Sequence, residues 1–223
     1  MDQFAAKRQA LLEAGVVMMD PATVYVEESV HVGAGTLLLP GTILRGSTVV
    51  GANCEIGPNT MLVNCTVGDG VTINSSQCND STIESGAHVG PFAYIRPNCH
   101  VGPDVKVGDF VELKNSTIGA GTKISHLTYV GDADVGKQVN FGCGTVLVNY
   151  DGNRKYRSMI GDHCFIGCNT NLVSPVHIGE GAYTAAGSTI TQDVAPDALA
   201  IARAHQVEKP GWAAAHRRKK AVQ

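Results

Sequence analysis

The stretch SHLTYVGDADVGKQVNFGCGTVLVNYDGNRKY, residues 125–156, decides how this chain folds. Its first part carries a repeat in which an aliphatic or aromatic residue recurs about every six residues, usually followed by glycine. In its second part a polar segment, NYDGNRKYRS at residues 149–158, interrupts this repeat. Because His, Tyr, Asn and Lys interrupt an otherwise monotonous repeat here, we expect the functional site at this interruption.

The six-residue period extends through most of the chain, from Val32 to Ile190. It fits no α-helix, whose apolar face recurs every three and four residues, and it outlasts any ordinary strand. Each hexad therefore predicts one short strand and a corner, and three hexads predict a triangular coil of about 18 residues whose interior the aliphatic residues fill. Alternation in a β-sandwich would instead need turn signals about every 8–12 residues, and we disfavour it.

The composition excludes several classes of function. The formal net charge is −3 and the pI is about 6.2, so no global basic field is present for nucleic acid. The basic run Arg217–Lys220 is interpreted as a solvated tail. The N-terminus lacks a signal core, and no stretch approaches the about 18 apolar residues of a membrane span. We expect a cytoplasmic protein with no nucleic-acid or membrane partner.

The seven cysteines form no CxxC pair, and the nearest spacing, Cys164 and Cys168, matches no zinc template. Unpaired thiols in a reducing compartment are the simplest account. Three convergent histidines cannot be assembled either, so we expect no metal. Among the histidines His126 stands out, because it lies in HLTY just before the polar break. The others are interpreted as exposed filler (His31, His88, His100 and His177) or as uninformative (His163 and His205).

Three parts of the chain differ in character. Residues 1–19 form a predicted helical segment whose helix, over residues 3–14, ends at Gly15. Residues 20–194 hold the repeat and form the predicted β-helix domain. Residues 195–223 lose the hexad and form a predicted irregular C-terminal arm with a basic tail. A terminal coil must be covered, and these two flanks are the candidates for that task.

Coil arithmetic adds a second signal for a site. Ile95 and Leu113 lie 18 residues apart at the same hexad position and should stack on consecutive coils. The residues after them, Arg96 and Lys114, would then lie about 4.8 Å apart on neighbouring strands. Stacked like charges are destabilising, so such a pair either splays into solvent or binds an anion such as phosphate. Lys155, with Arg154 and Arg157, would add positive charge if the interrupting loop folds back.

The hexad pattern resembles the left-handed parallel β-helix of hexapeptide acyltransferases, and the all-β fold with this handedness is what the resemblance implies. Residues 91–212 are more specifically similar to the acetyltransferase domain of the bacterial bifunctional N-acetylglucosamine-1-phosphate uridyltransferases/glucosamine-1-phosphate acetyltransferases. The matching runs include PFAYIRP, GDFVELKNSTIGAGTK, SHLTYVGDADVG, NFGCGT and NYDGNRKYRSMIGD.

This resemblance implies a role for individual residues. The sugar phosphate would be held by Arg96, Lys114, Tyr129, Asn140 and Lys155, and His126 would be the general base. Acetyl-coenzyme A would lie along Cys143, Asn149, Tyr150, Cys168, Ala186 and Arg203. Cys143 and Cys168 depart from the family pattern, in which we expect Ala and Ser. Backbone contacts would survive both departures, whereas a hydroxyl contact at position 168 would not.

The expected chemistry is acyl transfer to the amine of glucosamine 1-phosphate, a step toward the cell-wall precursor UDP-N-acetylglucosamine. His126 would remove a proton near neutral pH, and Glu112 is the residue that we expect to orient it. Either a backbone N–H or Tyr129 would stabilise the oxyanion. Direct attack within a ternary complex needs no nucleophilic cysteine.

The chain lacks the Gly-rich loop of the bifunctional enzymes' nucleotidyltransferase domain. We therefore expect acetyl transfer without uridyl transfer, and acetyl-coenzyme A as the co-substrate. Two alternatives stay open: a hexapeptide acyltransferase with another amino-sugar or hydroxyl acceptor, and a non-catalytic β-helix module. A homotrimer with active sites between subunits is expected, partly from the resemblance.

Overall fold

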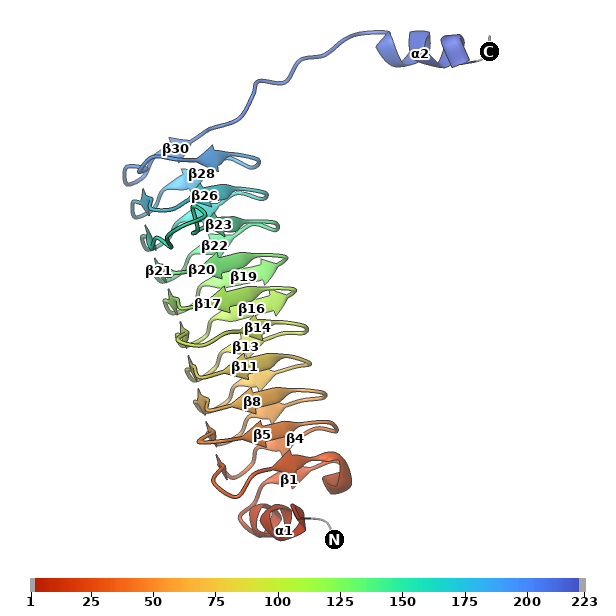
Figure 1. The fold of residues 1–223 in the computed structure, drawn as a ribbon, viewed down its shortest axis with the longest axis vertical. Helices are drawn as coiled ribbons and strands as arrows, with labels where there is room; N and C mark the ends of the chain where they lie inside the picture. Colours follow the sequence, from red (N-terminus) through yellow and green to blue (C-terminus); the bar gives the residue numbers. More distant parts are fainter. Residues whose placement is uncertain (1–2, 221–223) are drawn as a thin grey trace.

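The computed structural model describes residues 3–220, which form a three-sided stack of β-coils with a helix against its N-terminal end and a second helix at the end of a C-terminal arm (Figure 1). Within these residues the strands make three sheets, of 11, 10 and 9 strands, here called sheets A, B and C. Consecutive strands along the chain pass from A to B to C, and strands paired within a sheet run parallel. The predicted left-handed parallel β-helix is confirmed.

The strands are two to four residues long. Sheet A contains β1 (Val17–Met18), β4 (Leu37–Leu38), β7 (Glu55–Ile56), β10 (Thr72–Ile73), β13 (His88–Val89), β16 (Lys106–Asp109), β19 (Lys123–His126), β22 (Asn140–Phe141), β25 (Phe165–Ile166), β28 (Tyr183–Thr184) and β30 (Leu199–Ala200). Sheet B contains β2 (Tyr25–Val26), β5 (Ile43–Arg45), β8 (Met61–Val63), β11 (Gln77–Asn79), β14 (Tyr94–Ile95), β17 (Glu112–Lys114), β20 (Tyr129–Gly131), β23 (Val146–Val148), β26 (Asn171–Val173) and β29 (Thr189–Ile190). Sheet C contains β3 (His31–Val32), β6 (Val49–Val50), β9 (Thr66–Val67), β12 (Thr82–Ile83), β15 (His100–Val101), β18 (Thr117–Ile118), β21 (Ala133–Val135), β24 (Ser158–Ile160) and β27 (His177–Ile178).

The core is a set of aliphatic columns inside the prism. On sheet B, Leu44, Leu62, Ile95 and Leu113 occupy matching register positions on β5, β8, β14 and β17, and each is fully buried. Burying one such side chain is worth about 1.5–3 kcal/mol, and most coils add one from each of the three sheets. The expected stacking of Ile95 on Leu113 is confirmed by the β14–β17 register. The residues on either side of these positions point outward and are available for function.

The corners use left-handed backbone. At the corner between sheets B and C the described non-glycine turn residues with positive φ are Asn64, Asp80, Asn98, Asn115 and Asp132. Asn and Asp tolerate this conformation better than other side chains that carry a Cβ. This corner therefore carries a ladder of amides and carboxylates on consecutive coils, and Asp132 belongs to the candidate site described below.

The two flanks behave differently. Helix α1 (Ala5–Glu13) lies across the N-terminal end of the stack, with Arg8 and Leu11 buried, and Gly15 follows it at φ 89°. A short 3₁₀ helix, η1, occupies Pro21–Thr23. After β30 the chain leaves the prism as an exposed, extended segment that ends in helix α2 (Trp212–Lys220) (Figure 1). The arm predicted as irregular thus contains one strand, β30, and one helix, α2. The outermost residues of both predicted flanks, 1–2 and 221–223, lie outside the described residues.

The strands extend slightly beyond the predicted limits of the domain, from Val17 to Ala200 rather than from 20 to 194. Residues 199–200 join sheet A through β28, although the hexad has faded from the sequence there. Among the described residues, neither helix has the length and apolar character needed to cross a bilayer.

Candidate functional site

Two cations stack on the outer face of sheet B. Arg96 and Lys114 follow Ile95 and Leu113, which are register partners on β14 and β17. Each cation has its own carboxylate: Arg96 Nη1 donates to Glu112 Oε1 at 2.8 Å, and Lys114 Nζ contacts Asp132 Oδ2 at 3.2 Å. The carboxylates thus relieve the like-charge repulsion that the sequence implied.

Asp132 is the centre of a buried polar network that sequence reasoning did not select. Its carboxylate accepts from Asn115 Nδ2 at 2.6 Å, from Lys114 Nζ at 3.2 Å and from Asn149 Nδ2 at 2.5 Å. Asn149 Nδ2 also reaches the Tyr129 hydroxyl at 3.3 Å. Burial acts to raise the pKa of Asp132, but the hydrogen bonds from Asn115, Lys114 and Asn149, together with the charge of Lys114, hold this pKa below its usual value. The network fixes Lys114 and Tyr129 to the loop that begins at Asn149.

The interrupting loop is a compact turn rather than a free segment. Tyr150 and Lys155 form an antiparallel bridge, and the Asp151 carboxylate accepts the backbone N–H groups of Asn153 and Arg154 at 2.7 and 2.6 Å. The Tyr156 hydroxyl donates to Asp151 at 3.0 Å. Asp151 therefore holds the turn closed and fixes where Lys155 emerges.

Arg157 anchors the base of this loop through contacts with β21 and the neighbouring turn. Its guanidinium donates to the Asp134 carboxylate at 2.6 and 2.5 Å and to the carbonyl of Ala133 at 3.0 Å. It also donates to the carbonyl of Asn115 at 2.9 Å. A bidentate carboxylate thus holds Arg157 at the edge of β21, where its charge still acts with that of Asp132.

Lys155 lies close enough to the stack for the two other cations to act on its pKa. The Lys114 ammonium, within hydrogen-bonding reach, lowers the pKa of Lys155, and Arg96 acts in the same direction, while Asp132 opposes them. Arg96, Lys114 and Lys155, here called the cation cluster, thus share one electrostatic environment. The cation cluster forms two ion pairs among the described residues, Arg96 with Glu112 and Lys114 with Asp132. Asp132 also accepts hydrogen bonds from two amides, so the three cations outnumber the carboxylates that pair with them. This arrangement suits an anion.

His126 lies at the corner where sheet A passes into sheet B, and its partner is Asp109. The His126 Nδ1 and Asp109 Oδ1 atoms are 2.6 Å apart, and the two residues are register partners on β19 and β16. The hydrogen bond with His126 lowers the pKa of Asp109. Glu112, expected to orient His126, instead bonds Arg96. The signal for Asp109 was present, because Asp109 and His126 each stand two residues after an interior aliphatic residue, Val107 and Ile124.

The same corner continues toward the C-terminal end of the stack. The β19–β22, β22–β25 and β25–β28 registers align Asp109 and His126 with Cys143, Cys168 and Ala186, a set here called the corner column. Neighbouring members lie about 4.8 Å apart, so the five span about 20 Å. A side chain at Gly142 would collide with the backbone of Cys168, which shows how closely the two turns approach.

The remaining predicted residues lie around this column. Asn140 is on β22 of sheet A, on the opposite side of the corner from the cation cluster. Tyr150 is exposed, and its hydroxyl donates to the carbonyl of Gly152 at 2.7 Å. Arg203 lies on the exposed arm beyond β30, where its Cδ would be 3.9 Å from a Cβ built on Gly187. One chain thus brings together the cation cluster, Tyr129 and Asn149, but leaves Asn140 and Arg203 apart from them.

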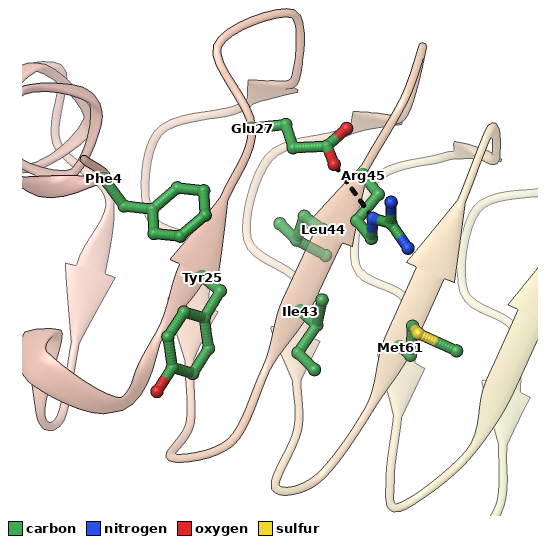
Figure 2. A pocket seen from close by; sticks show the side chains of 7 residues that line it. All are labelled: Phe4, Tyr25, Glu27, Ile43, Leu44, Arg45 and Met61. Carbon is green, nitrogen blue, oxygen red and sulfur yellow. Dashed lines mark hydrogen bonds and ion pairs between the residues drawn. The ribbon is translucent and has the colours of Figure 1, made fainter. Parts of the chain in front are cut away.

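An apolar hollow near the N-terminus is a separate feature. Figure 2 shows this hollow of about 280 Å³ on sheet B, where the Phe4 ring meets Tyr25 edge-on with centroids 5.8 Å apart. The charged groups there, Glu27 and Arg45, bond each other at 2.9 Å. None of the predicted site residues lines this hollow, so we do not assign it to the candidate site.

Comparison with known proteins identifies the repeat. The six-repeat model of the bacterial transferase hexapeptide matches residues 29–64, 80–115 and 157–192. The repeat predicted from the six-residue period is therefore the one found in bacterial transferases.

Curated relatives are similar along nearly the whole chain. The bifunctional protein GlmU of Brevibacillus brevis is 55% identical over 199 residues, which is 89% of this chain and 43% of that protein. The bifunctional protein GlmU of Clostridium beijerinckii is 52% identical over 201 residues, covering 90% of this chain and 44% of that protein. The chain spans less than half the length of these relatives.

A solved structure, the UDP-N-acetylglucosamine acyltransferase of Arabidopsis, matches 92% of this chain and 75% of its own with a TM-score of 0.50. Its sequence identity is 15%, so the likeness concerns the fold alone.

Proposed function

The chain carries the hexapeptide repeat of bacterial transferases and resembles the acetyltransferase part of the bifunctional family, and from this premise we propose that it is an acetyl-coenzyme A-dependent glucosamine-1-phosphate N-acetyltransferase. The observation that carries the proposal is the cation cluster on sheet B, next to a corner that holds a histidine–carboxylate pair. An acceptor with a phosphate and an amine fits these two features together.

The cation cluster is the proposed binding site for the sugar phosphate. Arg96 offers a guanidinium that can form two parallel hydrogen bonds, while Lys114 and Lys155 supply compact ammonium groups. Binding phosphate relieves the repulsion that lowers the pKa of Lys155, since the anion stabilises its protonated form. Tyr129, on the next strand of the same sheet, adds a hydroxyl to the proposed site.

His126 is the proposed general base, with Asp109 as its orienting partner. Because Asp109 accepts from Nδ1, the proton of neutral His126 is held on that nitrogen and the lone pair is left on Nε2. Nε2 would take a proton from the substrate amine as the amine attacks the thioester carbonyl. General-base assistance of this kind is worth roughly 10²- to 10⁴-fold.

The corner column is the proposed path of acetyl-coenzyme A. Its members Cys143, Cys168 and Ala186 lead from His126 toward Arg203. The column is open and extended, which suits a long flexible coenzyme arm, and the Arg203 guanidinium suits a phosphate at the far end. Asn149 and Tyr150 would line this path from the loop, although the Asn149 amide is also committed to Asp132.

A homotrimer would complete the proposed site. One flat prism face offers little concavity, whereas ligand sites are usually enclosed. Residues 201–211 of the arm are exposed, and Trp212 is 60% exposed, so the arm is free to reach a neighbouring subunit. Mixing inactive His126→Ala chains with inactive Arg203→Ala chains should restore activity in some mixed trimers. A fully active monomer by light scattering would contradict this assembly.

A coenzyme A thiol-release assay tests the function directly. Glucosamine 1-phosphate should be acetylated, whereas glucosamine without the phosphate should react far more slowly at the same concentration. Equal rates with both acceptors would contradict the phosphate site, and thiol release only with another amino sugar or a hydroxyl acceptor would favour the alternative acyltransferase. No release with any acceptor would favour the non-catalytic module.

A pair of substitutions tests which carboxylate orients His126. Asp109→Asn should lower turnover on the order of tenfold, a part of the general-base contribution, and should shift the pH profile of turnover. Glu112→Gln, the matched variant, should act mainly on the acceptor through Arg96, because Glu112 bonds that guanidinium. The reverse pattern would return the orienting role to Glu112.

A further inference from the structure

The cysteines of this chain fall into two groups. Cys54, Cys65, Cys78, Cys99 and Cys164 are buried, and burial raises the pKa of Cys65 to about 11, so these thiols are inert components of the core. Cys143 is partly exposed and Cys168 is exposed. Both lie outside the hydrophobic core, at the corner between sheets A and B.

These two outer cysteines are neighbours on consecutive coils. The β22–β25 register pairs Phe141 with Ile166, and each cysteine stands two residues after its member of that pair. The backbone confirms the alignment on both sides: Gly142 N–H donates to Ile166 O at 2.7 Å, and Asn169 N–H donates to Cys143 O at 2.8 Å. Neighbouring strands are about 4.8 Å apart, which falls within the roughly 4.4–6.8 Å range of Cα separations that disulfides span.

We propose that Cys143 and Cys168 form a reversible disulfide by exchange with a small-molecule disulfide, and that this bond blocks the corner column. One cysteine thiolate attacks the small disulfide, forming a mixed disulfide and releasing one small thiolate. The second cysteine then attacks the protein sulfur of the mixed disulfide and releases the other small thiolate. The two protein thiols lose two electrons and two protons in total, and one small disulfide is reduced to two small thiols.

The surroundings make this bond reversible rather than structural. Cys168 is exposed, so both the oxidising disulfide and a reducing thiol can reach it. The two turns are held at the sheet spacing by flanking backbone hydrogen bonds, so the two cysteines stay neighbours whether the bond is open or closed. Exposed or strained disulfides have the more oxidising potentials and are the labile ones.

The disulfide has a functional consequence that rests on the proposed function. Cys143 is the register neighbour of His126, and Cys168 lies between Cys143 and Ala186 in the corner column. A bond between the two thiols changes the surface along which the coenzyme is proposed to lie. Oxidation should therefore weaken acetyl-coenzyme A binding, and bound acetyl-coenzyme A should in turn slow the oxidation.

The first experiment identifies the bond without using activity. The native protein is incubated with oxidised glutathione, free thiols are alkylated, and tryptic peptides are examined by mass spectrometry. Cleavage after Lys137, Arg154, Arg157 and Arg203 places Cys143 in residues 138–154, and Cys164 and Cys168 together in residues 158–203. A cross-link between these peptides that dithiothreitol removes is the expected result.

Two variants assign the bond. Cys168→Ser should abolish the cross-link, while Cys164→Ala, which removes the buried cysteine of the same peptide, should leave the cross-link in place. Glutathione attached to Cys168 with no cross-link would overturn the proposal, as would a cross-link that survives in Cys168→Ser.

The second experiment separates this inference from the proposed function. Binding of acetyl-coenzyme A to the reduced and the oxidised protein is measured by calorimetry, with at least tenfold weaker binding expected after oxidation and recovery after reduction. Equal binding in both forms would overturn the blocking role. A reduced protein that binds acetyl-coenzyme A but acetylates no amino-sugar phosphate would count against the proposed function, while weaker binding after oxidation would still support the switch.

Discussion

Arg45 and Arg96 occupy the same outward position on sheet B, in the N-terminal and the middle coils of one repeat. Each follows a fully buried aliphatic residue, and each bonds a glutamate, Glu27 at 2.9 Å and Glu112 at 2.8 Å. The two ion pairs have nearly the same length, with the glutamate beside the preceding strand in the first and on the following strand in the second. What differs is the surroundings: Arg45 adjoins an apolar hollow, whereas Arg96 adjoins Lys114 and Lys155.

This difference shows how the repeat separates scaffold from function. The interior columns are alike in both regions, so the backbone presents the same outward positions on every coil. In the N-terminal coils those positions carry apolar groups and a self-contained ion pair. In the middle coils they carry an excess of cations, a histidine–aspartate pair and a loop. A chemically specific surface therefore arises from outward residues alone, with no change in the core.

The largest expected effect concerns His126 against His88. Both are exposed histidines on strands of sheet A, His126 on β19 and His88 on β13. Of the two, His126 has the Asp109 carboxylate at 2.6 Å and lies at the corner that leads into sheet B, where the cation cluster is. His126→Ala should lower turnover by roughly 10²-fold or more with folding intact, and His88→Ala should leave turnover unchanged. Steady-state kinetics at saturating substrates, with circular dichroism as the folding control, measure both. Near-normal turnover of His126→Ala would remove it from the mechanism.

Next come the two arginines themselves. Arg96→Ala removes a charge-assisted contact to the acceptor phosphate, worth about 1.5–3 kcal/mol, or roughly a 10- to 150-fold rise in the KM for glucosamine 1-phosphate. Lys114→Ala should act in the same direction, and the KM for acetyl-coenzyme A should change little in either variant. Arg45→Ala removes an equivalent ion pair outside the site and should alter neither KM. A matching loss in Arg45→Ala would mean that the effect reflects folding rather than binding.

The repeat was predictable because its causes are local. A hexad with one aliphatic and one small residue specifies a strand and a corner wherever it occurs, so the stacking of Ile95 on Leu113 followed from counting. Coil length is not constant, however: Ile95 and Leu113 are 18 residues apart, whereas the paired Asp109 and His126 are 17 apart. Partners across coils are therefore found by matching hexad positions rather than by a fixed count, and that match pairs His126 with Asp109 and not with Glu112.

The loop was predictable in outline only. Its polar composition marked the interruption, and the role of Lys155 beside the cation stack stays a prediction. The position of Arg157 depends on a bidentate contact with Asp134, 23 residues away in the chain, which composition does not encode. Asp132 was missed for the same reason, because its role comes from Asn149, 17 residues later, meeting it in space. Contacts between the loop and the coils require the structure.

The smallest effect should appear in stability, where Asp132 is compared with Asp80. Both are turn residues with positive φ at the corner between sheets B and C. Asp80 is exposed and accepts one amide, from Asn64 at 2.9 Å. Asp132 is buried and bonds Lys114, Asn115 and Asn149. Asp132→Asn should therefore cost about 1–3 kcal/mol of unfolding free energy near pH 7, since a partly buried ammonium and two amides lose their carboxylate. Asp80→Asn should cost little.

The stabilisation that Asp132 provides should depend on pH, and it should decrease as the pH falls. The pKa of Asp132 in the folded chain lies below its usual value, so the unfolded state binds a proton more readily than the folded state does. The stabilisation is then fully present above the unfolded pKa of about 3.9 and is lost as the pH falls through the lower, folded pKa. Urea midpoints measured between roughly pH 7 and pH 3 should show the wild type converging on Asp132→Asn only at the acid end of the range. A gap between the two proteins that stays constant with pH would mean that Asp132 acts through its shape and not through its charge, and the buried network would then need no ionised carboxylate.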